Sequence, residues 1–227
     1  MNKMMPNLLS KNKIKTLLAS TLIVFGASQA LAADPIDLTK IVPEAPVLSS
    51  EAYVLIDYNS GQILAEKNAN LRRDPASLTK MMTSYVIGQA IKAGTIAPTD
   101  MVTISKNAST MNPVFKGSSV MFLKEKSSVS VADLNYGIII QSGNDACVAM
   151  AEHVAGNQQA FIGLMNAYVK SLGLKDTQFQ TVHGLDSADQ FSTAHDMAFL
   201  GAALIRDVPD EYAIYKEKEF TFSNIRQ

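Results

Sequence analysis

The sequence predicts a domain of the mixed α and β class, with most of its helices in the middle of the chain. Two β-strands are expected first, a group of helices follows, and further strands begin only near the end. A parallel α/β sheet would instead alternate strands with helices along the chain. We therefore expect strands from both ends of the chain to assemble into one sheet.

The first 32 residues have the features of a cleavable secretory signal. Lysines up to Lys15 precede an apolar run over residues 16–27, and Ala30-Leu31-Ala32 provides a small-x-small cleavage site. A membrane anchor is the alternative, but a spanning helix usually needs about 20 predominantly apolar residues, and this stretch is short and interrupted. We expect cleavage after Ala32 and a folded domain over residues 33–227.

The first half of this domain begins with two strands and a helix. Residues 52–57 and 62–65 are predicted strands, and Asn59-Ser60-Gly61 between them is suited to a turn. Asp74 is the expected N-cap of the helix, and Pro75 suits its first position. Apolar side chains then recur at helical spacing as far as Ala90, and Gly94 ends the pattern.

The second half contains four more predicted helices and several short strands. Ser130 with Asp133 resembles a capping box, and Gly156 and Gly173 are predicted helix ends. The expected helices cover residues 130–141, 145–156, 158–172 and 194–205, and the expected strands cover 101–104, 119–123 and 219–222.

Composition excludes several classes of function. The formal net charge is −1, which argues against nucleic acid as a partner, because phosphates require a concentrated basic face. Cys147 is the only cysteine, so it cannot form an intrachain disulfide, and its apolar surroundings indicate a buried side chain. His153, His183 and His195 are too scattered to form a metal-binding motif, so neither a metal nor another cofactor is expected.

Ser77 and Lys80 are the first residues whose spacing indicates chemistry. Positions i and i+3 share one face of a helix, so the hydroxyl and the amine can meet. A neutral lysine can then act as the base that activates serine. Alone the motif is weak, because Ser10 and Lys13 repeat it inside the signal segment. An ordinary solvated helix start is the other interpretation.

Ser142-Gly143-Asn144 interrupts two strongly apolar helices. A loop that presents two short polar side chains is one interpretation, and a simple helix–helix turn is the other. Together with Ser77 and Lys80, however, it gives the ordered pair Ser-x-x-Lys and Ser-x-Asn, which is the signature of penicillin-binding proteins and serine β-lactamases.

The similarity extends over nearly the whole of the expected mature domain. Residues 74–80, 112–119, 141–147, 179–185 and 216–222 resemble the low-molecular-mass D-alanyl-D-alanine carboxypeptidases of the penicillin-binding protein 5/6 type. The resemblance implies a serine β-lactamase/transpeptidase-like fold, in which an antiparallel sheet is flanked by helices and accompanied by a helical subdomain. It also implies a periplasmic enzyme of cell-wall biogenesis and cell-shape maintenance.

The resemblance further implies a role for each site residue. Ser77 would attack the terminal D-alanyl-D-alanine bond of a peptidoglycan stem pentapeptide, and Lys80 would be its base. Ser142 would relay a proton to the leaving amine, and Asn144 would bind substrate and help to position Lys80. β-Lactams would acylate Ser77 as covalent inhibitors, and His183 could support the site from behind or be purely structural.

Three departures from the family pattern are visible. A Lys-Thr-Gly strand is absent, as are a later β-rich domain and an amphipathic membrane-anchoring helix, so we expect a truncated family member with an incomplete sheet. Residues 106–112 are one residue shorter than the family's version and lack its tryptophan. His195, before Asp196, stands where arginine is expected, which puts in doubt a salt bridge that would brace the loop beneath the site.

Two other functions remain as alternatives. A class A β-lactamase would need a glutamate after Ser142 to activate the deacylating water, and no convincing Glu-x-x-Leu-Asn stretch is present. A non-catalytic or unstable fragment is the other alternative, because losing even one oxyanion donor costs about 10²–10³ in kcat.

Overall fold

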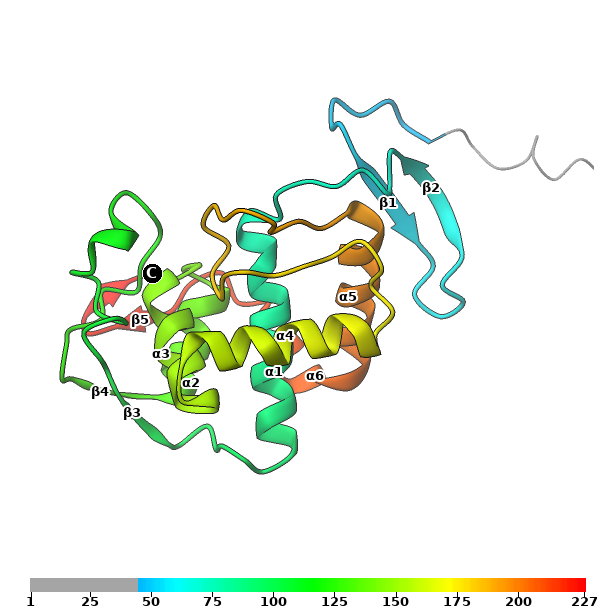
Figure 1. The fold of residues 1–227 in the computed structure, drawn as a ribbon. Helices are drawn as coiled ribbons and strands as arrows, with labels where there is room; N and C mark the ends of the chain where they lie inside the picture. Colours follow the sequence, from blue (N-terminus) through cyan, green and yellow to red (C-terminus); the bar gives the residue numbers. More distant parts are fainter. Residues whose placement is uncertain (1–44) are drawn as a thin grey trace, which may run out of the picture. The chain divides into compact units, whose positions relative to one another are not determined.

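The computed structural model describes residues 45–227, which form one compact unit. The predicted signal segment and the start of the domain at residue 33 lie outside the described residues. Helices dominate the unit, and its strands form three separate two-stranded antiparallel sheets (Figure 1). The mixed α and β class is therefore confirmed.

Helix α1 (Thr79–Lys92) is the centre of the helical part. It contacts all five other helices, with α2 (Val131–Ile139) and α3 (Asn144–Ala155) on one side and α5 (Ala194–Asp207) and α6 (Pro209–Ile214) on the other (Figure 1). Most side chains of its first three turns are buried, including the polar Thr83 and Ser84. A helix that is buried nearly all round is held by packing rather than by propensity.

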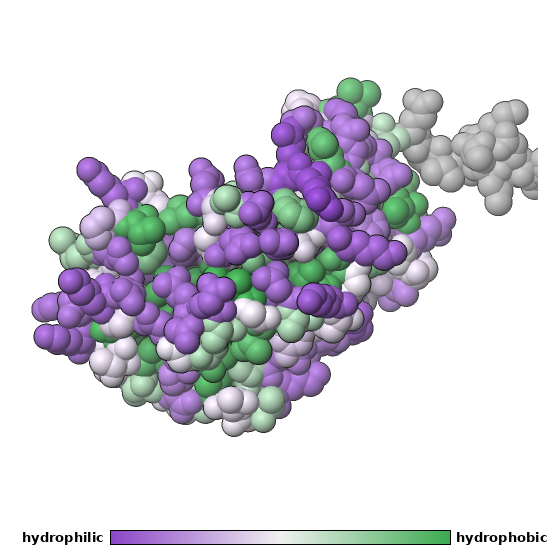
Figure 2. All heavy atoms as spheres, in the orientation of Figure 1, coloured by the Kyte–Doolittle hydropathy of each residue, from purple (hydrophilic) through white to green (hydrophobic). Residues whose placement is uncertain are grey.

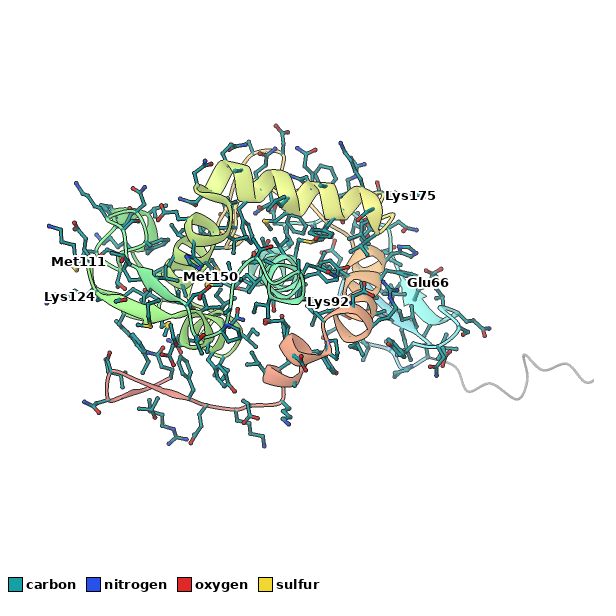
Figure 3. The ribbon with its side chains drawn as sticks, turned by 90° about the horizontal axis from the view of Figure 1, so that it is seen from below. Glu66, Lys92, Met111, Lys124, Met150 and Lys175 are labelled. Carbon is teal, nitrogen blue, oxygen red and sulfur yellow. The ribbon has the colours of Figure 1, made fainter. Side chains whose placement is uncertain are left out.

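Helix α4 (Gln158–Ser171) packs against both α1 and α3. The apolar side chains of these helices meet in one core, whose largest fully buried members include Phe161, Met82 and Met150. In Figure 3, Met150 lies between α3 and α1, whereas Glu66, Lys124 and Lys175 lie at the periphery. The core therefore fixes α1 and α3, which begin near the two predicted motifs.

Each of the three sheets in the described part of the chain is a short antiparallel pair of strands. Strand β1 (Tyr53–Ile56) pairs with β2 (Ile63–Lys67), β3 (Met101–Thr103) with β4 (Ser128–Ser130), and β5 (Thr221–Phe222) with β6 (Ile225–Arg226). The expected joining of strands from both ends is wrong for the described residues. The β1–β2 hairpin packs on α5 instead, while β5–β6 lies near α2, where the rings of Phe220 and Tyr136 are 5.9 Å apart.

The β1–β2 hairpin also exposes apolar side chains. Leu55 is 56% exposed and Leu64 is 53% exposed, and Figure 2 shows hydrophobic residues at the surface of this part of the molecule. No described residue covers them.

Most predicted helix boundaries are confirmed. The Ser130 side chain caps α2 by accepting a hydrogen bond from the Asp133 amide, and Gly156 ends α3 with φ +79°. Helices α3, α4 and α5 begin within one residue of the predicted positions. Helix α6 and a 3-10 turn, η3 (Pro113–Phe115), were not predicted.

Two local predictions are wrong. Asp74 does not cap a helix, because Ala76 is left-handed (φ +46°) and the chain enters α1 through a 3-10 turn, η2 (Ala76–Leu78), that has no side-chain cap. Residues 119–123 form no strand. The amide groups of Met121 and Leu123 donate to the side chain of Asp145 instead of to a neighbouring strand.

Candidate active site

Ser77 is held exposed in η2, just before α1 begins. The chain before it is fixed by reciprocal backbone hydrogen bonds between Arg73 and Ser192. The turn at Gly184 packs directly behind it: a methyl group on Gly184 would lie 1.9 Å from the carbonyl oxygen of Ala76. Gly184 also has φ +90°. Only glycine meets both demands, since it has no Cβ and tolerates positive φ.

Lys80 is buried below Ser77. Its Nζ atom donates to the carbonyl oxygen of His183 at 2.6 Å and lies 3.4 Å from Oγ of Ser77. No carboxylate within residues 45–227 forms an ion pair with it. Burial lowers the pKa of Lys80, because desolvation disfavours the charged amine. The neutral amine that a base requires is therefore easier to reach here than in an exposed lysine.

Cys147 is the buried neighbour that could oppose this effect. A thiolate there would raise the pKa of Lys80 by Coulomb attraction. However, burial raises the pKa of the Cys147 thiol to about 12. The thiol is thus neutral near pH 7 and supplies no counter-charge to Lys80.

Ser142 completes the contact with Ser77. Helix α2 ends at Ile139, and Gly143 donates its amide to the carbonyl oxygen of Gly137, which turns the chain back. Ser142 has φ +58° there, a conformation that costs most residues free energy and is enriched at functional sites. Its hydroxyl donates to Oγ of Ser77 at 3.1 Å. The three predicted catalytic side chains therefore converge on one point.

Asn144 is the first residue of α3 and is buried. Its side-chain Nδ2 donates to Oγ of Ser118 at 2.9 Å, and its backbone N–H donates to the carbonyl oxygen of Ser119. No hydrogen bond joins it to Lys80 among the described residues. Asn144 therefore does not position Lys80 through a direct hydrogen bond, as was expected. The backbone carbonyl of His183 contacts Lys80 instead.

Asp145 is a site residue that sequence reasoning missed. Its buried carboxylate accepts hydrogen bonds from the Met121 and Leu123 amides at 2.7 and 3.0 Å and from the Thr110 hydroxyl at 2.6 Å. These bonds fasten the segment 118–123 beside Ser142 and Asn144. The sequence signal was an acidic residue at an otherwise apolar helix start, a position that the helix dipole by itself favours.

His183 faces the core behind the site. Its Nδ1 accepts from the Leu185 amide at 3.1 Å, and burial, together with the positive charge of Lys80, lowers its pKa to about 4. The ring is neutral at ordinary pH and braces its own turn. Its backbone carbonyl, rather than its ring, contacts Lys80.

His195 contacts Asp196, although it stands at the position where arginine was expected. Its Nδ1 lies 3.1 Å from Oδ1 of Asp196, while the other carboxylate oxygen accepts from the Asp176 amide and the Thr177 hydroxyl at 2.8 Å each. The backbone and hydroxyl donors therefore hold Asp196 independently of the charge on His195.

The arrangement is suited to acyl transfer: an exposed hydroxyl lies within hydrogen-bond reach of both a buried amine and a second hydroxyl. Within residues 45–227, no group of three His, Cys, Asp or Glu side chains could hold a metal ion. No helix in the same range is long and apolar enough to cross a membrane.

Comparison with known proteins gives consistent matches. The family model described as peptidase S11, D-alanyl-D-alanine carboxypeptidase, matches residues 39–227. The D-alanyl-D-alanine carboxypeptidase DacA of Escherichia coli K12 is 59% identical over 224 residues, which is 98% of this chain and 56% of that protein. DacC of the same organism is 66% identical over 185 residues, which is 81% of this chain and 46% of that protein.

Solved structures of penicillin-binding proteins are also similar to this chain. Penicillin-binding protein 5 from Haemophilus influenzae is 56% identical, with a TM-score of 0.79 over 82% of this chain and 53% of that one. Penicillin-binding protein 6B from Escherichia coli is 50% identical, also with a TM-score of 0.79, over 82% of this chain and 59% of that one. The chain spans about half the length of the curated relatives it matches.

Proposed function

This chain belongs to the peptidase S11 family of D-alanyl-D-alanine carboxypeptidases, and we propose that it removes the terminal D-alanine from peptidoglycan stem pentapeptides. One observation carries the proposal most strongly. Lys80 is buried with no carboxylate partner among residues 45–227, 3.4 Å from the Ser77 hydroxyl, and its pKa is lowered by burial. That is the environment that turns lysine into a base and serine into a nucleophile.

The proposed reaction has two stages. In acylation, Lys80 accepts the proton of Ser77, and Oγ forms a bond with the carbonyl carbon between the two D-alanines. Ser142, 3.1 Å from Ser77, relays a proton to the departing amine as the amide bond breaks. In deacylation, water attacks the ester carbon, the bond from that carbon to the Ser77 oxygen breaks, and this oxygen regains a proton from the water. Asn144 is proposed to contact the peptide.

Penicillins are proposed to acylate the same serine. A solved relative is a penicillin-binding protein by name, and the Ser77, Lys80 and Ser142 cluster is the part of this chain that would react. The location that fits this function is the periplasm, reached by means of the predicted signal over residues 1–32.

The experiment is release of D-alanine from a synthetic pentapeptide that ends in D-alanyl-D-alanine. We expect release by the wild-type chain and none by the Ser77→Ala variant. Circular dichroism must first show that both fold. A folded wild type that releases no D-alanine would contradict the proposal and favour a non-catalytic binding fragment. Rapid turnover of penicillin would instead indicate a β-lactamase.

A further inference from the structure

Glu211 is a buried carboxyl group that the proposed reaction does not use. It belongs to the first turn of α6 and is 5% exposed. Its Oε1 accepts from Nδ2 of Asn135 on α2 at 2.8 Å, and its Oε2 accepts from the Ser84 hydroxyl on α1 at 3.4 Å. One side chain therefore links three helices.

Gly88 on α1 makes this close packing possible. A methyl group there would lie 2.6 Å from Cγ of Glu211 and 2.8 Å from Cβ of Val208. Such distances are far below van der Waals contact, so any larger residue would push α6 away from α1. The absence of a side chain at this helical position is what lets Glu211 reach Ser84, one turn earlier in α1.

The surroundings of Glu211 do not neutralise a negative charge. Within residues 45–227 no cation forms an ion pair with it, and Oδ1 of Asn135 is buried without a hydrogen-bond donor. Burial raises the pKa of Glu211 to about 7 and outweighs the hydrogen bonds from Ser84 and Asn135, which lower it, while the charge of Asp210 adds to the rise. Tyr215 also faces this group and is neutral, because its pKa is raised to about 12.

The nearest cations are already engaged elsewhere. A hollow of about 330 Å³ beside Glu211 is also lined by Lys92, Arg206 and Asp207. Lys92 donates to the backbone carbonyl of Asp207 at 3.0 Å, and Arg206 pairs with the Asp207 carboxylate. Figure 3 shows Lys92 at the end of α1, beside α5 and α6. The ionised form of Glu211 would therefore stay uncompensated, which is costly in a protein interior.

The helices that Glu211 joins also carry the candidate active site. Ser84 lies one helical turn after Lys80 on α1. Asn135 lies on α2, whose end leads into the turn that places Ser142 against Ser77. The two donors to Glu211 therefore lie on the same two helices that position Lys80 and the turn of Ser142.

We propose that Glu211 is a positioning residue: in its protonated form it clamps α1, α2 and α6 together, and its ionisation loosens the clamp and the alignment of Lys80 with Ser142. The effect on the reaction rests on the proposed function, whereas the clamp itself does not. A Glu whose folded-state pKa exceeds its unfolded value stabilises the fold below the unfolded pKa, and that contribution is lost as pH rises through the folded pKa.

Glu211→Gln is the direct test, because glutamine keeps the shape, cannot ionise, and can still accept from Asn135 and donate to Ser84. Thermal unfolding and hydrogen exchange of α1 and α2 are compared between about pH 5 and about pH 8. We expect the melting temperature and protection of the wild type to fall relative to those of Glu211→Gln as pH rises, because His183, whose lowered pKa gives the opposite trend, is common to both proteins. Glu217→Gln, at an exposed glutamate, should follow the wild type.

Asn135→Asp provides a second variant with the opposite sign. It places another carboxyl group against Glu211, so the loss of stability with rising pH should become steeper than in the wild type. Equal pH dependence in the wild type, Glu211→Gln and Asn135→Asp would overturn the clamp.

Acylation by a labelled penicillin separates the clamp from the proposed function. The ratio of the Glu211→Gln rate to the wild-type rate should be near one at about pH 5 and rise at about pH 8, because both proteins share the same Lys80 titration. A constant ratio would overturn the link between the clamp and the site. No acylation of the wild type at any pH would contradict the proposed function, and the melting and exchange results would then decide the clamp alone.

Discussion

The Nζ atom of Lys80 lies 2.6 Å from the carbonyl oxygen of His183 and 3.4 Å from Oγ of Ser77. The amine is thus aimed by a backbone carbonyl rather than by a carboxylate. A carboxylate would stabilise the charged form, whereas a carbonyl fixes the direction of the amine and leaves burial to lower its pKa.

Replacing Lys80 should remove the base without removing the nucleophile. We expect Lys80→Arg to slow the acylation of Ser77 by about 10²- to 10⁴-fold, because guanidinium does not deprotonate near neutral pH and general-base catalysis is typically worth that much. Stopped-flow or quench measurements with a labelled penicillin check this. Lys116→Arg, at an exposed lysine, is the control and should react like the wild type.

The wild-type acylation rate should also depend on pH through Lys80. The pKa of Lys80 is lowered, and only the neutral amine accepts a proton, so the rate should rise with pH and level off above that pKa. A rate that falls steadily across the same interval would show that the protonated amine is the active form.

Ser142→Ala removes the hydroxyl that contacts Ser77 at 3.1 Å. We expect acylation by the peptide to fall by about 10²-fold or more, because the departing amine loses its proton relay, while the melting temperature changes little because the hydroxyl is not in the core. Comparing acylation with melting curves tests this. Normal peptide turnover in the variant would remove Ser142 from the mechanism.

Gly184→Ala should damage the site, and Gly94→Ala is its matched control. Both glycines have positive φ, +90° and +70°, so both variants carry a backbone penalty of about 1–2 kcal/mol. Only Gly184 has a neighbour, the Ala76 carbonyl at 1.9 Å from the added carbon, while nothing lies within 4 Å at Gly94. We expect only Gly184→Ala to lose Ser77 acylation, and chemical denaturation to show the larger loss of stability for it.

Asp145→Asn should release the segment 118–123. An amide has only one acceptor oxygen, so at least one of the Met121, Leu123 and Thr110 donors would lose its partner, at a cost of about 1–3 kcal/mol. Urea unfolding measures the loss, and exposed Glu125→Gln on the same loop is the control. Equal stability of the two variants would show that the carboxylate does not hold this segment.

Much of this architecture was predictable because its signals are local. The Ser130 cap, the left-handed Gly156 and the apolar periodicity of α1 each act within a few residues. The Ser77 and Lys80 pair was predictable for the same reason, since i and i+3 positions meet on any helix.

The features that were not predictable depend on contacts between distant segments. The left-handed Ala76 is tied to the approach of Gly184, more than a hundred residues later. Asp145 takes the place of a neighbouring strand for residues 119–123. Glu211 on α6 accepts hydrogen bonds from Asn135 on α2 and Ser84 on α1, which lie 76 and 127 positions earlier in the sequence. Sequence periodicity carries no information about such partners.

The central claim is that Ser77 is the nucleophile. Its most direct test is mass spectrometry of the full chain after incubation with a penicillin. The account predicts one added drug molecule, located on the peptide that contains Ser77, and no addition in a folded Ser77→Ala variant. Equal labelling of that variant, or a label on another residue of the wild type, would contradict it.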